Sequence, residues 1–470
     1  MTLVSDLSPA KADSSALSRR FYITAWRWHF YAGLYVAPFL LMLAVTGLIM
    51  LWTATLFGRD GEKTYVVAPQ ATLASVSAQA EAAVRELPGQ IVQYIAPRTD
   101  EQASLFRINQ GETFFMVAVD PYKAETLGYW QRRDGLYDLA STIHGTLLIG
   151  DVGDRLIEIA AGFGIMLVVT GLYLWWPRDA RGFGSVLVPQ LSAKGRQLWK
   201  SLHLTIGFYA SLFLVVFLVS GLTWAGIWGQ KMTQAWSTFP AEKWDNVPLS
   251  DKTHASMNHG GIKQVPWTLE QTPMPASGSD AGVTGTPEGQ PITLDAIVTL
   301  ARTLGFDQRF QLAFPGDDTA VWTIARDTMS NDSANPLDDR TVHVDQYTGR
   351  ILADVGFSDY GAAGKAMAAG IAFHEGDMGL WNLVLVNIFC LSIIFLSVSG
   401  FVMWWKRRPK GAARLVAPTV GAPGPLWKSG AFVMLATALL FPLSGAVLLA
   451  VLLLDLLVFR HIAPLKKALS

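Results

Sequence analysis

The feature that most constrains this chain is a set of five apolar stretches, each long enough to cross a lipid bilayer. A helix of about 20 apolar residues spans the hydrocarbon core of a membrane. A backbone in lipid must pair its own N–H and C=O groups, which favours helices over irregular structure. We therefore predict an α-helical integral membrane protein with five transmembrane helices. The apolar stretches cover roughly residues 30–53, 156–176, 202–228, 381–405 and 430–459.

The charges between these stretches predict how the chain is oriented. The formal net charge is zero, but lysine and arginine gather before the first stretch and after the second and fourth. Loops rich in these residues stay in the cytoplasm. The two long connections, 57–143 and 230–373, are then extracytoplasmic. Arg460, Lys466 and Lys467 run against this rule if one fifth span leaves the C-terminus outside, and we expect such a kinked span.

This orientation divides the chain into segments. In order, they are a cytoplasmic arm (1–28), a first span (29–56), an extracytoplasmic domain (57–155), a second span (156–177), a cytoplasmic loop (178–200), a third span (201–228), an extracytoplasmic linker and domain (229–379), a fourth span (380–405), a cytoplasmic loop (406–428), a fifth span (429–459) and a tail (460–470).

Four histidines stand at the ends of the first four spans, in two pairs whose surroundings match. His29 and His203 each open a span, with a glycine four residues later and a hydroxyl-glycine pair further on. His144 and His374 each precede a span that ends in a hydroxyl-glycine pair, two tryptophans and basic residues. The glycines are Gly33 and Gly207; the hydroxyl-glycine pairs are Thr46-Gly47, Ser220-Gly221, Thr170-Gly171 and Ser399-Gly400.

This pattern predicts two bound haem groups. His29 and His203 follow cytoplasmic segments and form an inner pair, whereas His144 and His374 lie at the outer ends and form an outer pair. Two neutral imidazoles are standard axial ligands of a haem iron. Gly33 and Gly207 share a helix face with their histidines and clear space for a flat ring. We expect Gly145, Gly376 and Gly379 to do the same near the outer pair.

Other readings of these residues stay open. A single histidine at a membrane surface is often only wetted by headgroups, and the glycines could serve helix packing. Arg27 could pair with a haem propionate or be an ordinary cytoplasmic charge. The only cysteine, Cys390, excludes disulfides, Cys-ligated iron–sulfur clusters and covalent c-type haem.

The extracytoplasmic connections also repeat one another. Residues 73–137 and 292–350 each begin with a helical pattern, continue with alternating strands such as 113–120, 321–326 and 340–345, and reach a Val-Asp turn. Each is predicted to be a small α+β domain. The stretch 265–291, rich in Pro, Gly, Ser and Thr, favours a linker.

Weaker signals lie in the second connection. His254, Met257 and His259 could bind a metal or belong to a polar loop, which we favour. His343 is predicted to be structural.

Paired modules with Val-Asp-x-Tyr-Thr-Gly turns, and spans ending in Gly-x-x-x-Trp-Trp before basic residues, resemble the PepSY-associated transmembrane proteins. The resemblance covers about residues 20–410, although Tyr122-Lys123-Ala124 departs from the usual Tyr-Thr-Gly. It points to the branch of iron-regulated membrane proteins and ferric-siderophore reductases. The two α+β domains are then PepSY-like.

The resemblance implies a multi-pass protein of the bacterial inner membrane that carries two bis-His haem b groups. His29, His203, His144 and His374 would be the iron ligands, and the reaction would reduce a ferric siderophore or other Fe(III) chelate. The chain has no dinucleotide-binding fingerprint, so we expect an external electron donor, either quinol or a cytoplasmic flavoprotein. Lipid is an expected partner and nucleic acid is not.

Two other functions remain possible. The chain could be a non-redox scaffold whose PepSY domains bind peptides or restrain a peptidase. It could also transport iron or haem, although its repeats are parallel and no span is broken at mid-membrane.

Overall fold

The computed structural model describes residues 9–177, 182–233, 246–258, 265–408, 415, 432, 435–436, 438–459 and 461–462. The chain forms two compact units. The first, here called the helical unit, comprises Met1–Thr46, Ile143–Lys231 and Asn387–Ser470. The second, here called the sheet unit, comprises Gly47–Thr142 and Met232–Val386.

Four helices are long and apolar enough to cross a membrane, in agreement with the first four predicted spans. They are α1 (Pro9–Phe57), α4 (Asp151–Trp175), α6 (Gly195–Leu222) and α9 (Leu380–Arg407). The fifth predicted span overlaps a shorter helix, α11 (Pro442–Leu454), and a π-helical turn, η7 (Asp455–Phe459). Phe441 before α11 is not helical, because proline at position 442 starts a helix better than it continues one.

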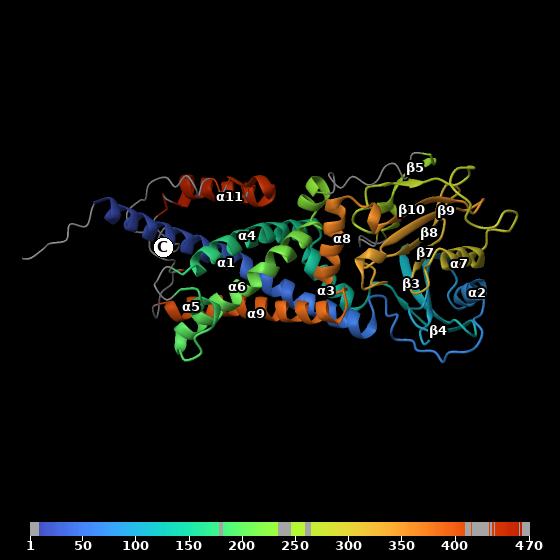
Figure 1. Ribbon diagram of the computed structural model, residues 1–470, viewed down its shortest axis with the longest axis horizontal. Helices are drawn as coiled ribbons and strands as arrows, with labels where there is room; N and C mark the ends of the chain where they lie inside the picture. The colour runs from blue at the N-terminus through green and yellow to red at the C-terminus, as the bar shows by residue number, and fades with distance from the viewer. Residues whose placement is uncertain are drawn as a thin grey trace, which may run out of the picture. The chain divides into compact units, whose positions relative to one another are not determined.

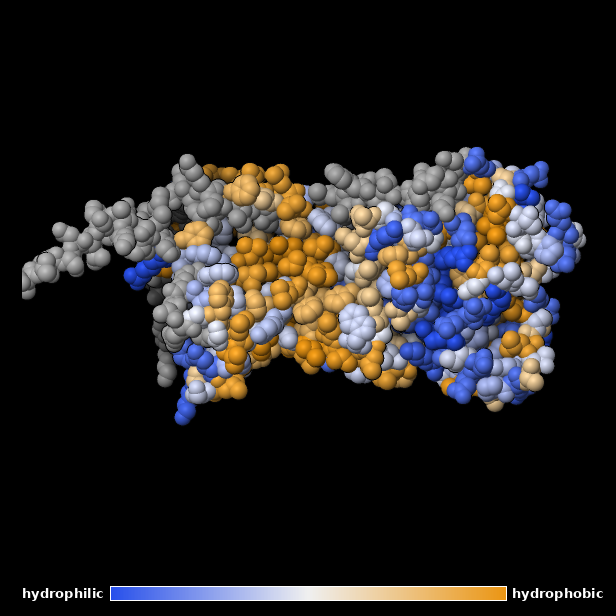
Figure 2. Space-filling model, in the orientation of Figure 1, coloured by the Kyte–Doolittle hydropathy of each residue, from blue (hydrophilic) through white to orange (hydrophobic). Residues whose placement is uncertain are grey.

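Within the helical unit, each of the four long helices, which are labelled in Figure 1, contacts the next in the order α1, α4, α6, α9 and back to α1. Aromatic and cation–π contacts join each neighbouring pair, and apolar side chains gather on the outer surface of these helices (Figure 2). The contacts are Tyr35–Phe163 between α1 and α4, Trp175–Phe208 between α4 and α6, Phe217–Phe389 between α6 and α9, and Arg407–Trp26 between α9 and α1.

Helix α11 packs on α4 through small residues. The Ser444 hydroxyl donates to the Ile159 carbonyl over 3.3 Å. A Cβ atom at Gly162 would lie 2.1 Å from that hydroxyl, so only glycine fits there without a shift. Trp228 also donates from Nε1 to the Leu440 carbonyl over 2.8 Å.

The sheet unit contains one antiparallel sheet of eight strands in the order β10-β9-β8-β7-β1-β2-β3-β4 (Figure 1). The predicted helical patterns are confirmed as α2 (Val76–Glu86) and α7 (Leu294–Thr303). The three predicted strands are confirmed as β3 (Thr113–Asp120), β8 (Val321–Arg326) and β9 (Arg340–Asp345). The remaining strands are β1 (Gln90–Ile95), β2 (Ser104–Gln110), β4 (Glu125–Gln131), β7 (Gln311–Ala313) and β10 (Ile351–Gly356).

The two predicted α+β domains therefore share one sheet. Strands β1 and β7 pair where the repeats meet, with Tyr94 opposite Leu312. The buried Gln93 side chain donates to Gln311 over 2.6 Å across this junction. Each strand would otherwise leave an unpaired row of backbone groups, and pairing the repeats removes both exposed edges. Side chains from both repeats form one hydrophobic core with α2 and α7.

The stretch 265–291 is not a linker, contrary to the prediction from its composition. Trp267, Leu269 and Thr286 are buried, and residues 273–275 form strand β6 (Pro273–Pro275) paired with β5 (Leu249–Thr253). A few large apolar side chains anchor the segment despite its turn-forming residues.

Shorter elements complete the fold. They are α3 (Leu136–Thr146), α5 (Gly184–Leu187), α8 (Ala362–Glu375), the π-helical turn η1 (Trp228–Thr233) and the 3-10 turns η4 (His254–Met257), η5 (Pro336–Asp338) and η6 (Phe357–Asp359).

The two Val-Asp turns have the same structural role. Asp120 Oδ1 accepts from the backbone of Tyr122, and Asp345 Oδ1 accepts from that of Tyr347, each over 2.8 Å. Ala124 has a φ of 51° where Gly349 has 66°, so the departure in the first turn keeps the backbone shape. Aspartate commonly stabilises turns in this way.

Candidate functional site

Two of the predicted ligand histidines are held by hydroxyl groups of the neighbouring helix. His29 Nδ1 on α1 lies 3.0 Å from Thr170 Oγ1 on α4. His203 Nδ1 on α6 lies 2.7 Å from Ser399 Oγ on α9. In each repeat, the histidine of the first span thus contacts the hydroxyl-glycine pair of the second. The sequence contained this signal as a repeated pair but did not tell which histidine each hydroxyl would meet.

The hydroxyl contacts favour one position for the proton of the imidazole ring. Thr170 donates to the Met166 carbonyl over 2.7 Å, and Ser399 donates to the Leu396 carbonyl over 3.1 Å. A hydroxyl has only one proton to give. With its proton on the carbonyl, each hydroxyl accepts from the imidazole, so Nδ1 carries the hydrogen and Nε2 carries the lone pair. This is the tautomer that a histidine needs in order to bind a metal through Nε2.

His144 follows the same rule. It lies in α3, and its Nδ1 is 2.9 Å from Thr46 Oγ1, which donates to the Met42 carbonyl over 2.8 Å. Leu147 and Leu148, directly after α3, have φ angles of 53° and 62°. Two bulky residues in the left-handed region are unusual and store strain, which often accompanies function.

The fourth histidine, His374, belongs to the last turn of α8 in the sheet unit. The turn after it is tied down, because Arg59 pairs with Glu375 over 3.1 Å and also with Asp377. Gly376 and Gly379 have φ angles of 85° and 84°. These positive φ angles shape the connection from α8 to α9. They explain why glycine occurs at both positions without invoking space for a haem ring.

The glycines near the inner histidines fall into two kinds. A Cβ atom at Gly171 would lie 3.1 Å from His29 Cε1, so the lack of a side chain at Gly171 leaves space for the His29 imidazole. A Cβ at Gly33 or Gly207 would lie 3.7 or 3.6 Å from its nearest leucine, which is ordinary contact. Helix packing therefore does not require glycine at 33 or 207.

Arg27 donates to the Tyr31 hydroxyl over 3.4 Å on the same helix. Within the described residues, no three His, Cys, Asp or Glu side chains form a group suited to a metal ion. A centre built on these histidines would thus use imidazole pairs.

The comparison with known families agrees with this repeated arrangement. A match to the PepSY-associated TM region covers residues 26–407, which is most of the chain. The chain belongs to the PepSY-associated TM family. As a member of that family with four suitable helices, it is a membrane protein. No curated protein matches the chain.

The chain also has a buried acidic residue, Glu158, that we did not predict from the sequence. Glu158 lies in α4, and its carboxylate accepts from the backbone of Ile227 and Trp228 over 3.2 Å each. Asp154 accepts from Gly226 over 3.1 Å. The acids satisfy N–H groups just beyond the end of α6. An acid inside the apolar stretch 156–176 was the available signal.

His254 is not part of a polar loop, contrary to our preference. It is 1% exposed, and its Nε2 lies 2.9 Å from Nε2 of His343, which is 0% exposed. His254 Nδ1 lies 2.8 Å from the Thr272 carbonyl, so Nδ1 must donate. His343 then donates from Nε2 and accepts at Nδ1 from Thr323 over 3.0 Å. The structural role predicted for His343 fits this pair, and His259 lies outside the described residues.

We expect the buried pair of His254 and His343 to make the folded protein less stable in acid. Burial lowers the pKa of His254 to about 4, and burial and His254 lower the pKa of His343 well below 6.5. The unfolded chain binds protons below about pH 6.5 and the folded chain does not, so stability falls as pH drops from there towards 4. At about pH 5 the lowered pKa of His254 alone costs roughly 2 kcal/mol, and His343 acts in the same direction.

A double variant, His254→Gln with His343→Gln, isolates this effect. Burial raises the pKa of Asp339 to about 7, which stabilises the fold as pH falls and opposes the histidines. The quantity to compare is therefore the change in Tm between about pH 7 and pH 5 in the two proteins. Wild type should lose more than the variant; equal losses would contradict the assignment.

Proposed function

We propose that this protein is a di-haem b protein of the bacterial inner membrane that delivers electrons to ferric chelates outside the cytoplasm. The observation that carries the proposal is the set of three hydroxyl-held histidines. His29, His203 and His144 each meet a hydroxyl through Nδ1. A partner of this kind orients an imidazole and raises its basicity as a ligand.

The residues present suit haem. His29 and His203 would hold one group and His144 and His374 the other. A bis-histidine haem b supplies one-electron exchange without a change of ligands. Gly33 and Gly207 lie four residues from the inner histidines, and a Cβ atom at either would make only ordinary contact with a leucine, so helix packing alone does not explain glycine there. Arg27 would be the cation for an inner propionate.

The chain's own residues would orient the ligands and exclude water. The hydroxyls of Thr170 and Ser399 contact Nδ1 of His29 and His203, which leaves Nε2 for the iron. The substrate reaction adds one electron to Fe(III), giving Fe(II), which hard oxygen ligands hold less tightly. Quinol or a cytoplasmic flavoprotein would supply the electron.

The contact between Ser399 and His203 can be tested directly. Ser399→Ala removes the acceptor for Nδ1, and we expect roughly a 10- to 100-fold loss of haem affinity at the inner pair. Ser392→Ala is the matched control. Ser392 lies on the same helix and donates to the Ile388 carbonyl over 2.8 Å, and no histidine of the described residues is hydrogen-bonded to it.

The measurement is haem content and the reduced-minus-oxidised spectrum of each purified variant. Ser399→Ala should lose or shift one spectral component, whereas Ser392→Ala should match wild type. Identical spectra and haem affinity in wild type and both variants would contradict the claim that the Ser399 hydroxyl prepares His203 as a haem ligand.

A further inference from the structure

One arginine of the helical unit lies beside the turn of α1 that contains His29. The Cζ atom of Arg407, at the end of α9, is 5.2 Å from the ring centroid of Trp26 and 5.4 Å from that of Phe30. These two aromatic residues are about one helical turn apart, and His29 lies between them in the sequence. Cation–π contacts therefore hold Arg407 at the level of α1 that carries an inner histidine.

The same arginine is aligned with the glycine that faces the other inner histidine. A Cβ atom at Gly400 would lie 3.8 Å from His203 Cε1, so this position of α9 faces the imidazole. Arg407 follows Gly400 by about two helical turns, and residues at that spacing lie on one face of a helix. The face of α9 that meets His203 therefore carries Arg407 at its end.

The spacing between this glycine and an arginine occurs in both repeats of the sequence. Gly171 precedes Arg178 by the same number of residues as Gly400 precedes Arg407, and two tryptophans stand at the same offsets between them. Gly171 is the glycine that faces His29, and Arg178 itself lies outside the described residues. A positive charge anywhere in a cytoplasmic loop would be enough to orient the chain. A fixed distance from a histidine-facing glycine points instead to a role tied to the histidines.

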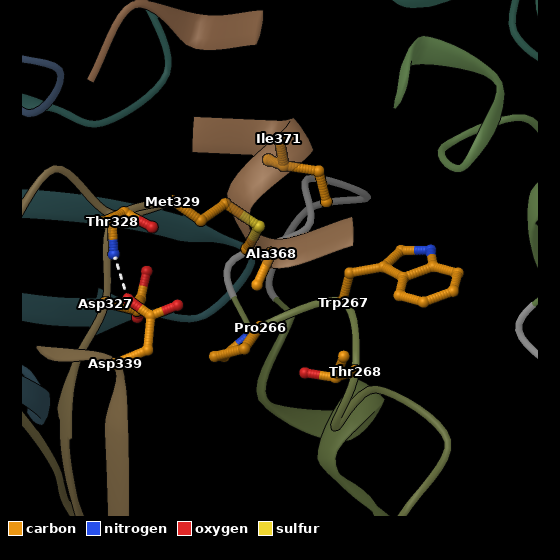
Figure 3. Close-up of a pocket in the computed structure, with 9 residues that line it drawn as sticks. All are labelled: Pro266, Trp267, Thr268, Asp327, Thr328, Met329, Asp339, Ala368 and Ile371. Atoms are coloured by element: carbon orange, nitrogen blue, oxygen red, sulfur yellow. Dashed lines mark hydrogen bonds between the residues drawn. The ribbon is translucent and has the colours of Figure 1, made fainter. Parts of the chain in front are cut away.

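The guanidinium group determines which class of ligand this position would take. It presents N–H donors in a planar fork that matches a carboxylate or a phosphate. Aromatic contacts already restrict the long side chain, so less conformational entropy is lost when it binds an anion. The sheet-unit cavity shown in Figure 3 has a different chemistry, because the titratable residues of its lining are Asp327 and Asp339. Two anions can occur at the level of Arg407, namely a haem propionate and the phosphate of a lipid headgroup.

We propose that Arg407 binds one propionate of the haem held by His29 and His203. This inference rests on the proposed function and names a further residue of the same site. The alignment of Arg407 with both inner histidines favours the propionate over a lipid phosphate. Haem has two propionates, so Arg407 acts together with Arg27. The positive charge of Arg407 also stabilises the reduced haem, which carries one more electron, and so raises its midpoint potential.

Reconstitution of the full-length protein with haem and with haem dimethyl ester tests this contact. The ester has the same iron and ring but lacks both carboxylate charges. The protein is purified in detergent from haem-deficient cells, and the inner component is the one that His203→Ala removes. Arg407→Gln should weaken binding of haem to the inner site by about tenfold, because a hydrogen bond to a charged group is lost. It should bind the ester as wild type does.

Arg408→Gln is the matched control, because Arg408 lies over other rings, with its Cζ 5.1 Å from the centroid of Trp404 and 5.6 Å from that of Trp405. It should bind haem and the ester like wild type. The midpoint potential of the inner haem should fall in Arg407→Gln and stay unchanged in Arg408→Gln. If Arg407→Gln does not fold, Arg407→Lys keeps the charge but not the planar fork and should weaken haem binding to a smaller extent.

The outcomes separate this inference from the proposed function. If wild type binds no haem, the proposed function fails and the inference fails with it. If wild type binds haem but Arg407→Gln weakens haem and ester equally, Arg407 only supports the fold and the inference alone is wrong. Unchanged haem binding in Arg407→Gln would also overturn it, and loss of co-purified anionic lipid from that variant would then assign Arg407 to a lipid phosphate.

Discussion

Replacing His144 or His374 with alanine is expected to stop the reduction of a ferric hydroxamate by the chemically reduced protein. The proposal makes these residues the ligands nearest the substrate. Removing either should cut the rate of Fe(II) formation at least about 100-fold, the upper range for a disturbed metal site. Fe(II) can be followed with a ferrous-specific dye under anaerobic conditions.

His461→Ala is the control for this experiment, because His461 is exposed and far in sequence from the repeats. It should reduce the chelate at the wild-type rate, and the inner component of the spectrum should stay reducible in the His144 and His374 variants. Reoxidation of wild type at one rate with and without chelate would refute reductase activity while leaving haem binding intact.

Alanine at His29 or at His203 is expected to remove the same half of the bound haem. The two imidazoles lie on different helices, α1 and α6, and the proposal makes them ligands of the same iron. If both histidines bind one iron, loss of either one should release the same haem. Each variant should therefore hold about half the wild-type haem and lose the same spectral component, because the other bis-histidine pair is intact.

The pairing itself is tested by the outer variants. His144→Ala should remove the component that His29→Ala retains. If His29→Ala and His144→Ala eliminate one common component and spare another, the inner and outer assignment is wrong. Haem extraction from each purified variant gives the count independently of the spectrum.

The sequence predicted the elements whose patterns are local. The runs 113–120 and 340–345 were predicted as strands and have the predicted bounds, although successive residues in both are buried, and in β3 they pack into two separate core clusters. The lengths of the apolar stretches gave four membrane-crossing helices for a similar reason. Neither result needed knowledge of a partner segment.

The features that escaped prediction depend on contacts between distant residues. His254 meets His343 across 89 positions, and Gln93 meets Gln311 across 218. The composition of 265–291 wrongly predicted a linker. A few buried side chains such as Trp267 order this segment despite its many turn-forming residues. The repeated hydroxyl-glycine pairs were visible, but their contact with histidine required the helix neighbours to be known.

The most direct test of the account is the absorption spectrum of the full-length protein purified from haem-replete cells. We expect a red protein with about two haem b groups per chain, extractable in acid acetone and reducible by dithionite, since the chain lacks the cysteine pair of a covalent haem. A correctly folded, colourless preparation would contradict it.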